Sequence, residues 1–150
     1  MSDPYCMRTI QLDELDQLLA LYAHLHATDD ALPEAEVLRE RWEEFIADPR
    51  MRCFVVELHG ELIASCTLAI IPNMTRGTRP YGLIENVVTH RLYRRQGYGR
   101  AVLQAALEHA WQQGCYKVML LTGSKQEATL HFYEGAGFQR GVKTGFVAYP

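Results

Sequence analysis

The chain has 150 residues, of which 48% are hydrophobic, and its formal net charge is −3 at pH 7. This length suits a single domain, residues 1–150, with enough apolar material for a core that needs neither metal nor disulfides. The acidic balance argues against general nucleic-acid binding, and no apolar run reaches the roughly 20 residues of a membrane span. The four cysteines are widely spaced and form no CxxC pair, so we expect reduced thiols in a cytoplasmic protein without nucleic-acid or membrane partners.

The first third of the chain is predicted to be helical after one short strand. Cys6 to Ile10 has strand composition, and apolar residues at helical spacing follow from Asp13, a candidate N-cap. A second helix is expected to open at Pro33 and to stop at Asp48-Pro49. Its buried stripe is expected to comprise Val37, Leu38, Trp42, Phe45 and Ile46.

The pattern then changes to strands. Arg52 to Leu58 and Glu61 to Ile71 are rich in β-formers and flank His59-Gly60, which predicts an antiparallel hairpin. Residues 72–80 are expected to form a loop, and Tyr81 to Thr89 a further strand. In that strand, alternation would put Leu83, Glu85 and Val87 on one face, with Glu85 partly buried among apolar neighbours.

The last third predicts a crossover helix and a parallel strand. Gly97 to Gln113 reads as a long helix that ends before Gly114, a C′ glycine, with core residues Val102, Leu103, Ala106, Leu107, Ala110 and Trp111. Lys117 to Thr122 is apolar enough for the centre of a sheet. A capping box at Ser124 is expected to start the next helix, which ends near Gly135 or Gly137.

Two further strands are expected at Phe138 and at Phe146 to Tyr149. The predicted fold is therefore α/β, with a mixed central sheet of about six to seven strands flanked by four helices.

A phosphate-binding loop is the strongest functional signal. Arg94-Arg95-Gln96-Gly97-Tyr98-Gly99-Arg100 follows a strand and opens a helix, whose first-turn N–H groups favour an anion. Two glycines let a pyrophosphate approach the backbone, and the arginines supply charge. Ordinary turn chemistry and an RNA-stacking patch are alternative interpretations. The Walker pattern and the full dinucleotide fingerprint are both missing.

The sequence resembles the GNAT acetyltransferases. Arg94-x-x-Gly97-x-Gly99 matches their (Gln/Arg)-x-x-Gly-x-(Gly/Ala) signature, and residues 131–138, HFYEGAGF, match their later Tyr-x-x-x-Gly-Phe element. Gly114-Cys115-Tyr116-Lys117 and the strand with Glu85 look like glucosamine-6-phosphate N-acetyltransferases. That group has Asp where this chain has Asn86, and a second Asp on the strand at 121–123, so the resemblance leaves the acceptor open.

The resemblance implies roles for individual residues. Glu85 would be the general base and Tyr133 the group that protonates the leaving thiolate. Acetyl-CoA would be the acyl donor, with no metal, bound by Val87, Val88, Arg94, Arg95, Gln96, Gly97, Tyr98, Gly99, Arg100, Gln126 and Thr129. Gln126 and Thr129 replace the Asn and Ala that many members carry. Transfer would be direct, since no cysteine–histidine pair marks a covalent route.

The acceptor and the assembly remain open at this point. A small-molecule amine is our first hypothesis. A protein or peptide amine held against loop 72–80, and a non-catalytic acyl-CoA-binding module, are the alternatives. The six histidines lack metal-ligand spacing. Lys143 and Tyr149 are candidates for the acceptor pocket or a dimer contact, and family members are often homodimers, for which Phe146 to Tyr149 is a candidate edge.

Overall fold

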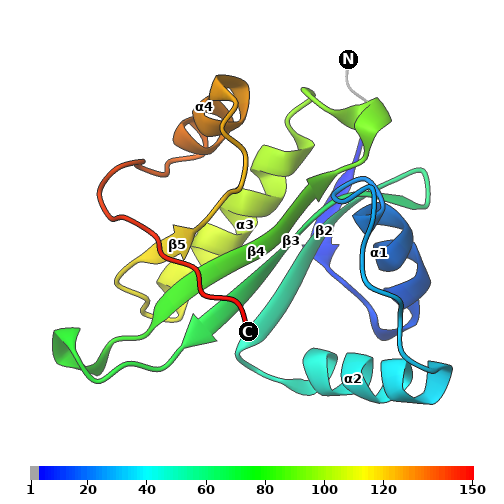
Figure 1. The fold of residues 1–150 in the computed structure, drawn as a ribbon, viewed down its shortest axis with the longest axis horizontal. Helices are drawn as coiled ribbons and strands as arrows, with labels where there is room; N and C mark the ends of the chain where they lie inside the picture. Colours follow the sequence, from blue (N-terminus) through cyan, green and yellow to red (C-terminus); the bar gives the residue numbers. More distant parts are fainter. Residues whose placement is uncertain (1–3) are drawn as a thin grey trace.

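The computed structural model describes residues 4–150, which form a five-stranded sheet with helices on both faces (Figure 1). The strands are β1 Cys6–Thr9, β2 Met51–Leu58, β3 Glu61–Ile71, β4 Tyr81–Thr89 and β5 Val118–Leu120. The helices are α1 Leu15–Tyr22, α2 Ala35–Ala47, α3 Tyr98–Gln112 and α4 Glu127–Gly135. Three 3₁₀ turns join them, η1 Leu12–Glu14, η2 Arg76–Thr78 and η3 Arg91–Tyr93.

The sheet is mixed, as predicted. Its strands lie in the order β1-β2-β3-β4-β5, in which the first four pair antiparallel and β5 joins β4 in parallel after the α3 crossover. The β2–β3 hairpin is confirmed, and both residues of its turn, His59 and Gly60, have left-handed φ angles of 52° and 79°. The C′ glycine Gly114 is also left-handed, with φ of 80°.

The predicted number of strands is too high. No strand follows β5 among the described residues, so the strands expected at Phe138 and at Phe146–Tyr149 are absent. Every residue from 139 to 150 is exposed. In Figure 1 it is the red trace that crosses in front of β5 and β4. β5 is accordingly a half-buried edge strand rather than the central strand we expected.

Two apolar clusters hold the helices against opposite faces of the sheet. On one face, Leu18 and Leu21 of α1 and Trp42 of α2 pack with Cys53, Val55, Leu62 and Val88. On the other, α3 buries Val102, Leu103, Ala105, Ala106 and Ala110, and α4 adds Tyr133. Trp111 was expected in this core but is 51% exposed, and Leu107 is only half-buried. Of the stripe expected on α2, only Trp42 is buried, because α2 crosses one end of the sheet (Figure 1).

The predicted helix starts lie too early. α1 follows the η1 turn, so Asp13 does not cap it. The N-cap of α2 is Glu34 and that of α4 is Gln126. The capping box at Ser124 is wrong, since the Ser124 hydroxyl accepts the N–H of Gln126 at 3.3 Å and donates to Thr129. None of the helices described in residues 4–150 is long and apolar enough to cross a bilayer.

Candidate functional site

The predicted phosphate loop connects β4 to α3, and its backbone N–H groups at the start of α3 are open. Gly97 is the N-cap of α3, with a left-handed φ of 91°, and its carbonyl accepts the N–H of Ala101 at 3.0 Å. The N–H groups of the turn before Ala101 therefore have no partner inside the helix. A Cβ added at Gly97 would meet no protein atom within 4 Å, so the outer side of this turn is open.

The charged and amide side chains of this loop are all exposed, and Arg94 also hydrogen-bonds to other segments. Arg95, Gln96 and Arg100 are exposed. Arg94 is tied to the fold, since its Nε donates to the Thr89 carbonyl at 3.2 Å and its Nη2 donates to the His24 carbonyl at 3.0 Å. The loop is thereby fixed both to the end of β4 and to the segment after α1.

Tyr98 and Gly99, also predicted to bind the cofactor, are buried. The Tyr98 ring lies in the core, 5.2 Å from the Tyr5 ring, which leaves its backbone as the part that faces the loop. A Cβ at Gly99 would lie 3.0 Å from the Thr89 hydroxyl and 3.1 Å from the Phe132 ring. Glycine here therefore lets α4 approach the start of α3 closely.

β4 and β5 separate where the chemistry is expected. Their parallel pairing covers only three pairs and ends at Ile84 and Leu120, while β4 continues to Thr89. Beyond Ile84 the edge of β4 has no strand beside it among the described residues. The separation exposes backbone N–H and C=O groups to a substrate on the side where α3 and α4 begin.

A β-bulge shapes this free part of β4. Thr67 pairs with Glu85 and Ser65 with Val88, so two β4 residues oppose one β3 residue. Asn86, one of the two, has φ of 54°, a left-handed angle that Asn tolerates better than most residues. Because the extra residue shifts the alternation, Val88 packs on the α1 side and Val87 on the α3 side.

Glu85 lies just before the bulge on the face that carries Thr67, and it is exposed. The burial that we expected from its apolar neighbours is therefore absent, because the bulge moves Val87 to the other face. An exposed carboxylate here is open to an acceptor amine or to a bridging water.

Tyr133 on α4, the second predicted catalytic residue, is half-buried. Its ring is 5.0 Å from that of Phe132 and 6.4 Å from that of Phe138, and it packs on the α3-side core. Burial raises the Tyr133 pKa above the ordinary value, and the negative charge of Glu85 raises it further. The phenol therefore stays protonated at neutral pH and can donate a hydrogen bond or a proton.

The remaining predicted cofactor residues stand at the start of α4. Gln126 is exposed, and the Thr129 hydroxyl is 3.2 Å from that of Ser124. The structure thus gathers the predicted residues at three places, the free half of β4, the start of α3 and α4.

The sequence analysis missed a cluster of cations on two aromatic rings. Arg76 and Arg79 lie 5.9 and 5.7 Å from the centre of the Tyr116 ring, and the Lys117 ammonium lies 5.3 Å from the rings of both Tyr81 and Tyr116. No ion pair found within residues 4–150 neutralises these cations. Arg76 and Arg79, three residues apart before Pro80, were the sequence pattern that could have indicated a cationic site here.

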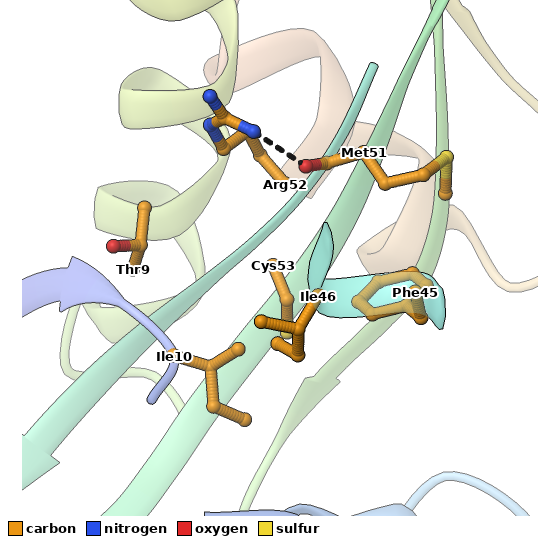
Figure 2. Close-up of a pocket in the computed structure, with 7 residues that line it drawn as sticks. All are labelled: Thr9, Ile10, Phe45, Ile46, Met51, Arg52 and Cys53. Carbon is orange, nitrogen blue, oxygen red and sulfur yellow. Dashed lines mark hydrogen bonds between the residues drawn. The ribbon is translucent and has the colours of Figure 1, made fainter. Parts of the chain in front are cut away.

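The two cavities described lie away from Glu85 and Tyr133. Figure 2 shows the first, between α2 and the start of β2, lined by Thr9, Ile10, Phe45, Ile46, Met51, Arg52 and Cys53. The second lies at the β3–β4 loop, lined by Arg50, Ile70, Pro72, Asn73, Met74, Thr78 and Pro80. Within residues 4–150, no group of three or more His, Cys, Asp or Glu residues is arranged to hold a metal ion.

Comparisons with known proteins agree with this geometry. The sequence model of the acetyltransferase (GNAT) family matches residues 13–138. A glucosamine 6-phosphate N-acetyltransferase of Trypanosoma brucei brucei is 34% identical over 139 residues, which cover 89% of this chain and 88% of that protein. The solved structure of a putative acetyltransferase from Agrobacterium tumefaciens str. C58 has a TM-score of 0.89 and 41% identity, and the match covers 97% of this chain and 99% of that one. A glucosamine-6-phosphate N-acetyltransferase from Arabidopsis thaliana shares the fold, with a TM-score of 0.84 at 22% identity over 99% of this chain and 100% of that one.

Proposed function

The chain belongs to the acetyltransferase (GNAT) family and is an N-acetyltransferase. We propose that it moves an acetyl group directly from acetyl-CoA to the primary amine of a small anionic molecule. The observation that carries the proposal is the end of the β4–β5 pairing at Ile84, which leaves the exposed Glu85 and the β4 backbone after it without a second strand. A protein amine and a non-catalytic binding role are the competing proposals.

The donor would lie along the free half of β4. Backbone N–H groups from Arg94 to Arg100, with the exposed Arg95 and Arg100, suit a pyrophosphate. The amides of the pantetheine arm would pair with the backbone at Val87 and Val88, and Gln126 and Thr129 would flank the arm from α4. The donor supplies an activated acetyl group as a thioester.

The residues at the reacting centre would handle two protons. A free alkylamine has a pKa near ~10, so the acceptor must lose a proton, which Glu85 would take directly or through water. The amine nitrogen then forms a bond to the acetyl carbon as the carbon–sulfur bond breaks. N–H groups of the bulged segment would stabilise the charge on the carbonyl oxygen, and the protonated Tyr133 would donate its proton to the departing sulfur.

The cation–aromatic cluster supports an acceptor with an anionic group. Tyr81 and Glu85 lie on the same face of β4, four residues apart, which is about 13 Å along the strand. The Lys117 ammonium lies over the Tyr81 ring and the two arginines lie over the Tyr116 ring, so the anionic group of an acceptor that extends from Glu85 toward Tyr81 would meet these cations. A phosphorylated amino sugar, the substrate named for the trypanosomal relative, has this form.

We further propose that the protein is a cytoplasmic homodimer. Phe146 and Tyr149 are 90% and 87% exposed, and Val147 is also exposed, which is unfavourable for a lone chain in water. β5 is an edge strand that a second copy's C-terminal segment could extend.

The testing experiment is release of the CoA thiol from acetyl-CoA with a panel of amines. The panel contains amino sugars and their 6-phosphates, polyamines, amino acids, aminoglycosides and short peptides. We expect the phosphorylated amino sugars to give higher kcat/KM than the unphosphorylated ones. Turnover of peptides alone would favour the protein acceptor, and binding of acetyl-CoA without turnover of any amine would favour the binding module.

Two variants test the assigned roles. Tyr133→Phe removes the proton donor but keeps the ring, and Glu85→Gln removes the base but keeps the shape. Each should lower kcat by about 100-fold or more while acetyl-CoA still binds by calorimetry. Full activity in either variant would remove that residue from the mechanism.

A further inference from the structure

Three consecutive residues of the β3–β4 loop have a left-handed backbone. Arg76, Gly77 and Thr78 have φ angles of 54°, 69° and 63°. Glycine adopts such angles freely, but they are sterically unfavourable for Arg76 and Thr78, which have a Cβ. Strain of this kind persists only where surrounding contacts hold it, and it is concentrated at functional sites. The contacts that hold this turn, and the side chains that it presents, therefore indicate its role.

Asn73 braces the turn across both of its ends. Its side-chain amide donates to the Thr75 hydroxyl at 2.9 Å and to the Thr75 carbonyl at 3.2 Å. The same amide donates to the Arg79 carbonyl at 3.3 Å. Inside the turn, the Thr78 N–H donates to the Thr75 carbonyl at 3.0 Å. The Arg79 Nε donates to the Arg76 carbonyl at 3.1 Å. The Asn73 amide thus connects the residues before and after the left-handed segment.

The braced turn presents two arginines to one aromatic ring. The guanidinium groups of Arg76 and Arg79 lie 5.9 and 5.7 Å from the centre of the Tyr116 ring. The α3–β5 connection that carries this tyrosine is fixed to the same loop, because the Tyr116 N–H donates to the Pro80 carbonyl at 3.0 Å. The backbone contacts of the loop therefore set the position of both arginines and of the ring between them.

Lys117 adds a third cation, on the face of the sheet that carries Glu85. Its ammonium lies 5.3 Å from the centre of the Tyr81 ring. Val118, the next residue, packs on the α3-side core, so alternation places Lys117 on the opposite face. Ile84 also packs on the α3 side, which puts Tyr81 and Glu85 on that same opposite face of β4. The third cation and the proposed base therefore lie on one face of the sheet.

The three cations lack a negative partner. No ion pair within residues 4–150 involves them. Like charges gathered around two rings repel one another, and the aromatic faces offset only part of this repulsion. A bound anion would remove it, and guanidinium groups donate in pairs to the oxygens of a phosphate. A phosphate monoester, with about two negative charges at neutral pH, suits such a site better than a carboxylate with one.

We propose that Asn73 is a positioning residue, which holds the left-handed turn so that Arg76, Arg79 and Lys117 form a preorganised site for a phosphate monoester on the acceptor. The inference rests on the proposed function and deepens it, since it names the residues that select the acceptor. Because the turn is already braced in the free protein, the arginines lose less conformational freedom when the phosphate binds. Asn73 acts through the two arginines.

The test compares glucosamine 6-phosphate with glucosamine as acceptors at saturating acetyl-CoA. Arg79→Gln should lower kcat/KM for the phosphorylated amine by about 10- to 100-fold, mainly through KM, because one charge-assisted hydrogen bond is lost. Asn73→Ala should lower it by about 3- to 10-fold, since it keeps both arginines but frees the turn. Neither variant should change kcat/KM for unphosphorylated glucosamine by more than about twofold. A merely structural role for Asn73 would lower both values alike.

Arg41→Gln is the matched control, because it removes the same charge from α2, where Arg41 pairs with Glu44 at 3.2 Å. It should leave the preference for the phosphorylated amine unchanged. Equal kcat/KM for the two amines in the wild type would overturn the inference, as would a preference that Arg79→Gln or Asn73→Ala leaves intact.

Titration with inorganic phosphate separates this inference from the proposed function, because it needs no turnover. In NMR spectra of the backbone amides at constant ionic strength, phosphate should shift the resonances of Arg76, Arg79 and Lys117. Asn73→Ala should raise the Kd obtained from these shifts. If no amine is acetylated, the shifts still support the anion site, and the failure lies with the proposed function. Shifts confined to residues 94–100, or no shifts at all, would overturn the inference.

Discussion

Substitution of Gly97 by alanine separates the backbone strain of the phosphate loop from its binding role. Gly97 has φ of 91°, and a left-handed conformation costs a residue with a Cβ about 1–2 kcal/mol. For a chain of this length, that loss lowers the midpoint of thermal unfolding by about 2–8 °C. The added Cβ would meet no protein atom within 4 Å, so the stability cost comes from the φ angle alone.

The same substitution should also weaken acetyl-CoA binding, independently of its effect on stability. The new methyl group would project into the open side of the turn and keep a phosphate oxygen from the N–H groups there. Loss of one charge-assisted hydrogen bond, worth about 1.5–3 kcal/mol, corresponds to a Kd for acetyl-CoA about 10- to 100-fold higher. Calorimetric titration with acetyl-CoA measures the Kd, and thermal unfolding followed by circular dichroism measures the stability.

Gly60→Ala is the matched control for strain. Gly60 lies in the β2–β3 turn with φ of 79°, and a Cβ there also meets nothing within 4 Å. It should lose similar stability but bind acetyl-CoA normally. Gly97→Asn adds a second comparison, because Asn tolerates the left-handed angle yet still blocks the loop. Wild-type affinity in Gly97→Ala, or equal weakening in Gly60→Ala, would refute the assignment of this loop to the pyrophosphate.

Three further predictions concern the surroundings of the site. Gly99→Ala should gain about 1 kcal/mol of helix propensity but lose about 1–3 kcal/mol, because the new Cβ would lie 3.0–3.1 Å from Thr89 and Phe132. Denaturant unfolding should therefore show a net loss of stability, and the displacement of Phe132 should lower kcat. The His24 pKa is lowered from 6.5, first by burial and then by the nearby His90, Arg91 and Arg94. Because the unfolded chain therefore binds this proton more tightly than the folded one, the free energy of unfolding should fall as the pH drops below about 6.5. His24→Asn, which can still accept the Arg91 N–H, should flatten that pH dependence of the unfolding midpoint, and an unchanged slope would contradict it. Removal of residues 142–150 should convert a dimer to a monomer by light scattering, and a dimer that persists would place the interface elsewhere.

Much of the fold was predictable because local signals agreed with the tertiary structure. The bounds of β3 and β4 match the prediction, and those of α3 lie within one residue at each end. In these segments three signals agree with the observed strands and helix. They are the spacing of apolar residues, every two in strands and every 3.6 in helices, the His59-Gly60 turn and the C′ glycine at 114. Agreement was poorest where a sequence pattern had no strand to pair with, as at Phe146–Tyr149, which has the composition of a strand but pairs with none among residues 4–150.

The helix caps and the surface of α3 show another limit of sequence reasoning. Ser124 has the right spacing for a capping box, but its hydroxyl also reaches Thr129, and the helix starts later. Trp111 has the right helical phase for the core, yet it lies at the end of α3 and is half-exposed. Both outcomes depend on where neighbouring elements pack, which the local pattern does not contain.

The bulge explains why the orientation of the predicted site residues on β4 did not follow from simple alternation. Strict alternation along β4 placed Glu85 and Val87 on one face, whereas the left-handed Asn86 sends Val87 to the α3 side. Glu85, just before this extra residue, is exposed where the pairing of β4 with β5 has ended. A strand without the bulge would continue a regular ladder there, so under the proposed function the irregularity would give the proposed base and the N–H groups access to the donor.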